Sequence, residues 1–183
     1  MNKEYRLADG TFARTRPQHN TLWLDDMFMG VPPIAWYSCI AGDKQQAIER
    51  SCTSDISICE TVCGFPRRNF SVMDGWKVCR IILLSIGDVP NGWALLTMCE
   101  VLDVLPEDYP QRDKILDLFR THVRGLAACQ SGEGFWHQLL DRNDSYLELQ
   151  PRLFMYIALL MLSIKDGLTP LLTDRLLIWD GMP

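Results

Sequence analysis

The distribution of apolar residues along the chain predicts a mostly helical protein. Residues 22–40 form an apolar run that is typical of a buried helix, although Pro32 and Pro33 are expected to kink or interrupt it. A second helix is predicted over residues 91–106, where apolar residues recur at helical spacing and a proline ends the segment.

A third helix is predicted to begin near Pro110. Its charged residues lie mainly outside one apolar stripe, as on a helix with one buried face. Since the connection to the preceding helix is short, the two helices are expected to form a hairpin. The stripe consists of Ile115, Leu118, Phe119, His122 and Leu126.

Residues 45–90 have a different character, because neither the helical nor the strand period holds there for long. Residues 80–86 resemble a short strand, but no strand of equal quality is found elsewhere to pair with it. Four of the seven cysteines fall in this stretch, and no two of the seven form a Cys-x-x-Cys pair. Reduced thiols are therefore favoured over a structural zinc site.

A loop at residues 131–134 leads into a segment that combines Trp136 with His137 and Gln138. A flat aromatic face beside imidazole and amide groups is suited to stacking on a sugar and hydrogen bonding to its hydroxyls. A half-buried hairpin arm is an equally supported interpretation of the same residues.

Two adjacent carboxylates, Asp25 and Asp26, stand inside the first apolar run. Removing an ionised carboxylate from water is costly, so a functional acid is one interpretation. Successive helical residues point about 100° apart, and only one of the two would then face a given site. The other interpretation is that either residue lies in the first helical turn and caps free N–H groups there. The residues by themselves favour the second.

Length and composition indicate one ordinary globular domain, with 183 residues and 48% hydrophobic content. The net charge of −5 provides no basic footprint, so nucleic acid and anionic membranes are not expected partners. The N-terminus lacks the apolar core of a signal peptide, and the longest apolar run, residues 153–164, is too short to span a bilayer. A soluble, cytoplasmic protein is expected.

Four ordered motifs resemble the unsaturated rhamnogalacturonyl hydrolases of glycoside hydrolase family 105. The resemblance covers about residues 9–44 and 91–148. The motifs are LWLDDMFMG at 22–30, NGWALL at 91–96 leading to EVLDVLP at 100–106, GFWHQ at 134–138, and DSYLE at 144–148.

The resemblance implies an all-α fold, the central fragment of an (α/α)6 barrel that is incomplete at both ends. Enzymes of this family remove the unsaturated 4-deoxy uronic acid from pectin-derived rhamnogalacturonan oligosaccharides. They hydrate the C4=C5 double bond and do not displace a group at the anomeric carbon. The oligosaccharide is the implied partner, and neither a metal nor an organic cofactor is implied. The oligomeric state is left open.

The resemblance also implies roles for individual residues. The Asp of the Trp-x-Asp part of the first motif corresponds to Asp25, which would protonate the alkene and activate the water that adds. Such a carboxyl group must be able to hold a proton when substrate binds, which requires an apolar setting. Asn91, Trp93, Trp136 and His137 would line or support the sugar site. A second carboxylate used by the family lies upstream of the matched residues.

The resemblance fails between the first two motifs. There the family has His-Gly-Trp-x-Glu-Gly and then His-Trp-x-Arg-Ala, whereas this chain has VMDGWK at 72–77 and SIGDVP at 85–90. Suppose that the coding sequence is translated in the neighbouring frame, so that each new codon joins the third base of one codon to the first two bases of the next. The amino acids that codon degeneracy then permits include the missing family motifs. The same shift over residues 149–179 permits a good continuation after the last motif. We therefore interpret residues 45–90 and 149–183 as frameshifted translations within a gene of this family.

Three functional hypotheses remain from the sequence. The first is an unsaturated uronyl hydrolase with Asp25 as general acid and base. The second is an inactive remnant, because helices in the two shifted stretches carry sequence that was not selected to pack. The third is a non-catalytic helical protein that binds sugar through the aromatic segment near Trp136.

Overall fold

The computed structural model describes residues 22–40, 48–49, 74–75 and 87–166, together with Tyr5, Ala13, Thr15 and Arg16. The helices are α1 (Leu24–Ile40), α3 (Asp88–Val104), α4 (Arg112–Ala128) and α5 (Gln150–Asp166). Two short antiparallel pairs accompany them, β1 (Leu22–Trp23) with β2 (Asp74–Gly75) and β3 (Trp136–His137) with β4 (Leu147–Glu148). The prediction of a mostly helical fold is confirmed.

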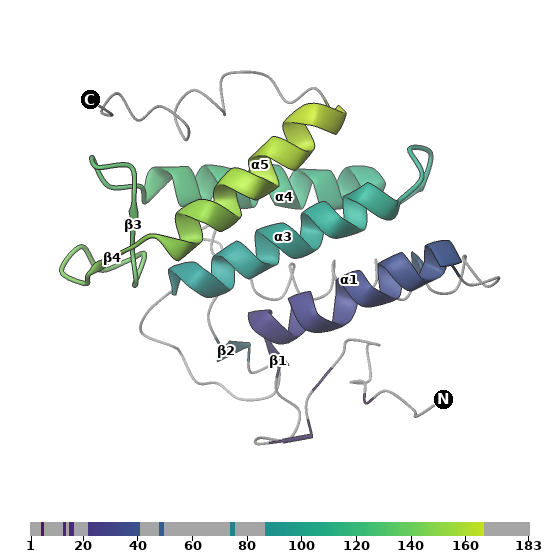
Figure 1. Ribbon diagram of the computed structural model, residues 1–183, viewed down its shortest axis with the longest axis horizontal. Helices are drawn as coiled ribbons and strands as arrows, with labels where there is room; N and C mark the ends of the chain where they lie inside the picture. Colours follow the sequence, from purple (N-terminus) through teal and green to yellow (C-terminus); the bar gives the residue numbers. More distant parts are fainter. Residues whose placement is uncertain are drawn as a thin grey trace.

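Helix α3 lies in the middle of the molecule, with α1 and α5 on its two sides and α4 behind it (Figure 1). Contacts along their length show that α1 and α3 are parallel. Phe28 meets Trp93 near the beginning of both helices, and Trp36 donates a hydrogen bond of 2.6 Å to Glu100 near their ends. Helix α5 runs in the same direction, whereas α4 returns antiparallel to α3 (Figure 1).

One row of aromatic rings crosses the three parallel helices. The ring of Trp93 on α3 lies between Phe28 of α1, with ring centres 4.6 Å apart, and Phe154 of α5, at 4.4 Å. Aromatic pairs at such separations contribute to stability beyond the area they bury. The three rings therefore fix how far α1, α3 and α5 are shifted along their axes relative to one another. The contacts lie about one turn after the first residue of each helix.

The α3–α4 hairpin forms as predicted. The buried residues of α4 include Ile115, Phe119, His122 and Leu126, while Leu118 is only partly buried. The guanidinium of Arg112 donates to the carbonyl oxygens of residues 102 and 105, at 2.6 and 3.2 Å. It thereby satisfies carbonyl groups at the end of α3, which have no partner within their own helix.

Pro32 and Pro33 do not interrupt the first helix, because α1 continues through both to Ile40. Proline lacks only its own N–H and keeps a helical φ, so a helix held on one side by packing can continue past it. Val31 and Ala35 flank the two prolines and are both buried in the core. Packing against α3 compensates for the lost backbone hydrogen bonds.

Two further differences concern the ends of helices. Helix α3 begins at Asp88, three residues before the predicted start at Asn91. Helix α5 is not among the helices predicted from the sequence, because the apolar run 153–164 is interpreted there as an accident of the reading frame; the structure forms a helix over this run. The predicted strand at 80–86 lies outside the described residues.

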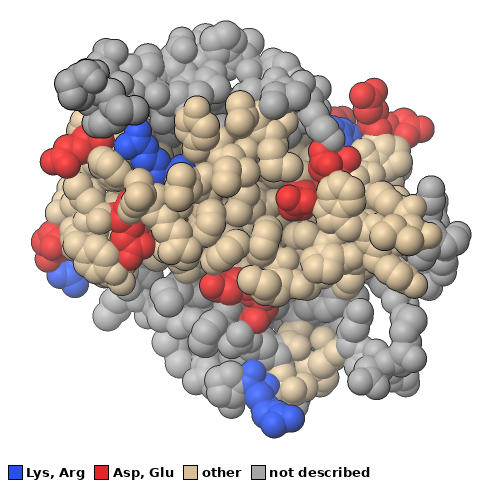
Figure 2. Space-filling model, viewed as in Figure 1, with Lys and Arg blue, Asp and Glu red and all other residues tan. Residues whose placement is uncertain are grey.

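Helix α5 presents an apolar face to solvent. Figure 2 shows that uncharged side chains dominate the face of the molecule over α5 and α3, with few charged groups between them. Residues three and four positions apart share one side of a helix, so these side chains form an apolar stripe. The exposed residues are Leu153, Tyr156, Ile157 and Leu160 of α5, and Leu149, which directly precedes it.

Candidate active site

The parallel arrangement brings the N-terminal turns of α1, α3 and α5 to one end of the molecule, and the β3–β4 hairpin lies at the same end (Figure 1). The motif around Asp25 and the motifs at 134–138 and 144–148 are far apart in the sequence and lie toward the same end of the helices, with the beginning of α3 between them (Figure 1). Carboxyl groups are numerous on these elements, with Asp25 and Asp26 in the first turn of α1, Asp88 at the start of α3 and Glu148 on β4.

Asp25 and Asp26 occupy the first turn of α1, and both are half-buried. The first-turn placement that the residues by themselves favoured is thus confirmed. A position in the first helical turn is compatible with a functional role for either carboxylate, because the first turn of α1 lies toward the same end of the helices as the other motifs (Figure 1). The helical geometry directs the two carboxylates about 100° apart, so they face different surroundings.

Asn91 and Trp93 lie inside the structure. The Asn91 side chain is 0% exposed and donates a hydrogen bond of 2.5 Å to the carbonyl oxygen of Gly87, which closes the first turn of α3. The indole of Trp93 has Phe28 on one side and Phe154 on the other. Both residues pack at the beginning of α3, and Trp93 is partly buried there between side chains of α1 and α5.

Trp136 is also buried, at 1% exposure, and its Nε1–H donates a hydrogen bond of 2.8 Å to the carbonyl oxygen of Leu126 in the last turn of α4. It anchors the hairpin from inside. Of the two interpretations of this segment, a sugar-stacking surface and a half-buried hairpin arm, the position of Trp136 agrees with the hairpin arm. His137, next along β3, points to the opposite face and is only partly buried.

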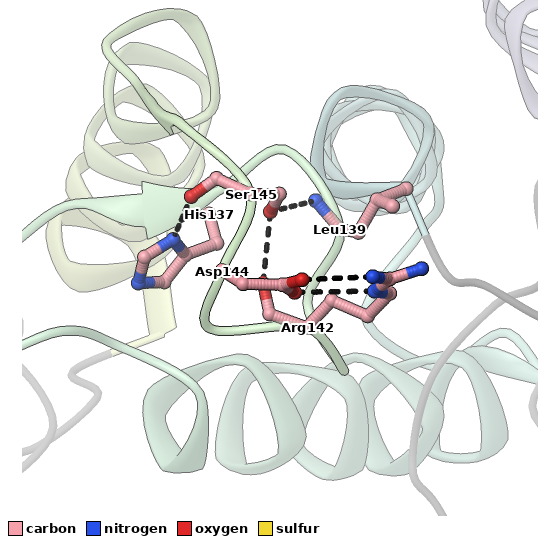
Figure 3. Close-up of polar contacts among 5 residues, drawn as sticks. All are labelled: His137, Leu139, Arg142, Asp144 and Ser145. Atoms are coloured by element: carbon pink, nitrogen blue, oxygen red, sulfur yellow. Dashed lines mark hydrogen bonds and ion pairs between the residues drawn. The ribbon is translucent and has the colours of Figure 1, made fainter.

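The imidazole of His137 is oriented by the turn that joins β3 and β4. Its Nδ1 lies 2.5 Å from the carbonyl oxygen of Ser145 (Figure 3). A carbonyl oxygen can only accept, so Nδ1 carries the hydrogen and Nε2 is the acceptor of the neutral ring. His137 can therefore accept a hydrogen bond from a sugar hydroxyl through Nε2.

The turn itself is braced by side-chain hydrogen bonds (Figure 3). The Ser145 hydroxyl accepts from the Leu139 N–H at 3.1 Å and donates to the Arg142 carbonyl oxygen at 2.9 Å. Arg142 pairs with Asp144 through two contacts of 3.1 and 2.8 Å. The hydrogen bond from Arg142 holds the pKa of the Asp144 carboxyl below its usual range.

A buried carboxyl group, Asp88, is not predicted from the sequence. It begins α3, is 1% exposed, and accepts the Val89 N–H through Oδ1 at 2.6 Å. Burial raises its pKa from 3.8 to about 7, and the negative charge of Glu148 adds to the rise. Asp88 lies in the stretch interpreted as frameshifted. Glu148 belongs to the last motif, and the family resemblance implies no role for Glu148. No pattern of neighbouring residues predicts that Asp88 and Glu148 lie close together.

The described residues contain no cluster of three or more His, Cys, Asp or Glu side chains arranged to hold a metal ion. In the same part of the chain, no helix combines the length and apolar character needed to cross a bilayer.

Comparison with known proteins identifies the class. The solved structure of a family 105 glycoside hydrolase from C. acetobutylicum ATCC 824 superposes with a TM-score of 0.85 at 18% identity, over 94% of this chain and 51% of that one. A possible family 105 member from Salmonella enterica gives 0.82 at 20% identity, over 96% and 48%. The fold is thus that of the (α/α)6 barrel glycosidases, as predicted, and the chain spans about half the length of these structures.

The model of Glycosyl Hydrolase Family 88 matches residues 1–62 and 90–170, and the chain belongs to this family. Two curated relatives are similar over short segments. The unsaturated rhamnogalacturonyl hydrolase YesR of Bacillus subtilis is 39% identical over 59 residues, 32% of this chain and 17% of the relative. The unsaturated 3S-rhamnoglycuronyl hydrolase of Alteromonas sp. is 35% identical over 46 residues, 25% and 11%. The resemblance to the unsaturated rhamnogalacturonyl hydrolases is confirmed.

Proposed function

We propose that this chain represents an enzyme that removes unsaturated 4-deoxy uronic acid from rhamnogalacturonan-derived oligosaccharides, with Asp25 as general acid and base. The observation that carries the proposal is the match of the chain to the family over both the Asp25 motif and the hairpin of His137. Family membership and the names of both curated relatives support the same class of reaction.

The proposed reaction is a hydration. The Asp25 carboxyl gives its proton to C4 of the double bond, water adds at C5, and the carboxylate takes a proton from that water. The product is a hemiketal, which opens and releases the aglycone. Proton transfer by a positioned carboxyl group accelerates such steps because it avoids free charge in the transition state. His137 is placed to accept a hydrogen bond from the sugar through Nε2.

We propose that the activity belongs to a longer gene product read in the family frame, and that residues 45–90 and 149–183 are translated out of that frame. The family model leaves residues 63–89 unmatched, which supports a frame change there, but it matches residues 45–62 of the first stretch and 149–170 of the second. Resequencing the coding DNA tests this directly. Extra or missing bases near codons 43–92 and 145–151 support it, and DNA that reads as given makes the chain a degraded copy.

The catalytic assignment is tested with the corrected gene product and an unsaturated disaccharide, whose ultraviolet absorbance disappears as the double bond is hydrated. Asp25→Asn is expected to abolish the loss of absorbance. Asp26→Asn is the matched control, since it removes the same charge from the same helical turn, and it is expected to retain most activity. Full activity of Asp25→Asn would exclude this mechanism. Saturable sugar binding without turnover in the unmutated protein would favour the non-catalytic alternative. A cytoplasmic location is part of the proposal.

A further inference from the structure

The carboxyl group of Asp88 poses a hydrogen-bonding problem. Its Oδ1 accepts the Val89 N–H, but its Oδ2 is buried and has no hydrogen-bond donor among the described residues. An ionised carboxylate left in this state is strongly destabilising, because a buried acceptor without a donor loses the hydrogen bonds it had in water. A proton on Asp88 removes the charge and turns the acceptor into a donor.

The group that can accept this proton is Glu148 on β4. The backbone places Asp88 beside the hairpin, because its N–H donates to the Gln138 carbonyl oxygen of one arm and Glu148 pairs with Trp136 on the other. The charge of Glu148 and a side-chain hydrogen bond with it add to the rise in the pKa of Asp88, which is due first to burial. Two ionised carboxylates cannot hydrogen bond to each other, since both are acceptors only. Tyr146, two residues earlier, donates to Glu148 through its phenol, which raises the pKa of that phenol.

We propose that Asp88 and Glu148 share one proton, and that this carboxyl pair fastens the β3–β4 hairpin to the first turn of α3. The pair is proposed for the 183-residue chain as it stands, and it does not depend on the function proposed above.

The main chain already joins the two elements on the side of β3. The Asp88 N–H donates to the Gln138 carbonyl oxygen at 3.1 Å, and Gly87 bridges to Leu139. Strand β4 has its own link to β3, where Glu148 pairs with Trp136. The shared proton adds a direct link from Asp88 to β4, so both strands of the hairpin are attached to α3.

The link depends on pH through this one proton. The titratable groups around it are Glu148 and Tyr146 on the side of β4 and His137 on β3. When Asp88 loses its proton, the bond to Glu148 becomes a repulsion between two carboxylates. The hairpin is then expected to loosen as pH rises through about 7, the pKa to which Asp88 is raised.

The experiment uses the 183-residue chain without substrate, so an inactive chain does not affect the result. The Asp88 carboxyl carbon is followed by 13C NMR against pH and assigned with Asp88→Asn. In parallel, hydrogen exchange of the Gln138 amide, which donates to the Tyr146 carbonyl oxygen at 2.8 Å, reports the closure of the hairpin. Exchange is expressed as a protection factor, which corrects for the intrinsic effect of pH.

Protection of Gln138 is expected to fall at least about tenfold between about pH 6 and 8.5, since each pK unit of coupling corresponds to a tenfold change. Asp88→Asn keeps a donor toward Glu148 at every pH and should abolish the fall. Glu148→Gln supplies a donor to Asp88 and should move the titration to lower pH. Glu107→Gln, in the exposed α3–α4 connection, is the control. It should leave both the titration of Asp88 and the pH dependence of Gln138 protection unchanged.

A titration of the Asp88 carboxyl near its ordinary value of 3.8 would overturn the proposal. So would a fall in protection that persists in Asp88→Asn, since a group other than Asp88 would then be responsible. The proposed function can fail in the disaccharide assay while this result stands, and the reverse also holds.

Discussion

Gly92 of α3 and Phe154 of α5 are so close that a Cβ at position 92 would lie 2.5 Å from the Phe154 ring and 3.0 Å from its Cβ. Glycine is therefore required there for close packing and not for an unusual backbone conformation. The contact lies beside Trp93, in the aromatic row that connects the three parallel helices.

Gly92→Ala is accordingly expected to destabilise the chain by about 1–3 kcal/mol, the usual cost of overpacking a core. Urea unfolding measures the change. Gly30→Ala is the matched control, because Gly30 also lies inside a helix but has nothing within 4 Å of the place where an alanine methyl group would lie. That variant should gain about 0.5–1 kcal/mol from helix propensity. Equal effects of the two substitutions would contradict the role of the α3–α5 contact.

Trp136→Phe is expected to cost about 1–3 kcal/mol, because it removes the buried indole hydrogen bond to the Leu126 carbonyl oxygen and part of the indole packing. The Leu126 carbonyl oxygen then keeps the Cys129 N–H as a donor. Trp36→Phe removes a comparable indole hydrogen bond, to Glu100, at an exposed position. It should cost less than about 1 kcal/mol, since water replaces the lost partner. Thermal unfolding of both variants provides the comparison, and a larger loss for Trp36→Phe would be inconsistent with the hairpin anchor.

The stability of the chain is expected to depend on pH through Asp88. Its pKa is raised from 3.8 to about 7 on folding, so the folded state holds the proton more tightly than the unfolded state. The resulting stabilisation is complete below about pH 4 and is lost as pH rises through about 7. The full difference is on the order of 4 kcal/mol.

Unfolding by urea at several pH values, for the unmutated chain and for Asp88→Asn, isolates the titration of Asp88 and of the Glu148 coupled to it, because the titrations of groups that do not interact with Asp88 cancel in the difference. Asp88→Asn should be the more stable protein at about pH 8 and lose that advantage toward about pH 4. A difference that stays constant with pH would show that Asp88 titrates alike in the folded and unfolded states.

Ser145→Ala is expected to loosen the turn that orients His137. The hydroxyl makes two hydrogen bonds, to the Leu139 N–H and the Arg142 carbonyl oxygen, each worth about 0.5–1.5 kcal/mol. In the corrected enzyme the variant should bind the unsaturated disaccharide more weakly. Asp144→Asn breaks only the exposed pair with Arg142 and should have little effect on binding. Similar losses in both variants would assign the role to the ion pair.

Local pattern was sufficient to predict several elements from the sequence. The stripe from Ile115 to Leu126 predicted α4, and the short connection before it predicted the hairpin with α3. These predictions succeed because helix period and loop length are properties of neighbouring residues. The four motifs led to the family and its fold in the same way, since a motif is a local string of residues.

Burial and pairing across the structure were decided by tertiary contacts. Trp136 could be an exposed stacking platform or a hairpin anchor until the carbonyl oxygen of Leu126 was placed beside its indole. Asp88 and Glu148 are 60 positions apart in the numbering, and no local pattern predicts that they face each other. The sequence by itself determined which helices form and which family they belong to, with α5 as the exception. Only the tertiary structure decided which polar groups lose water, because desolvation depends on every element packed around a side chain.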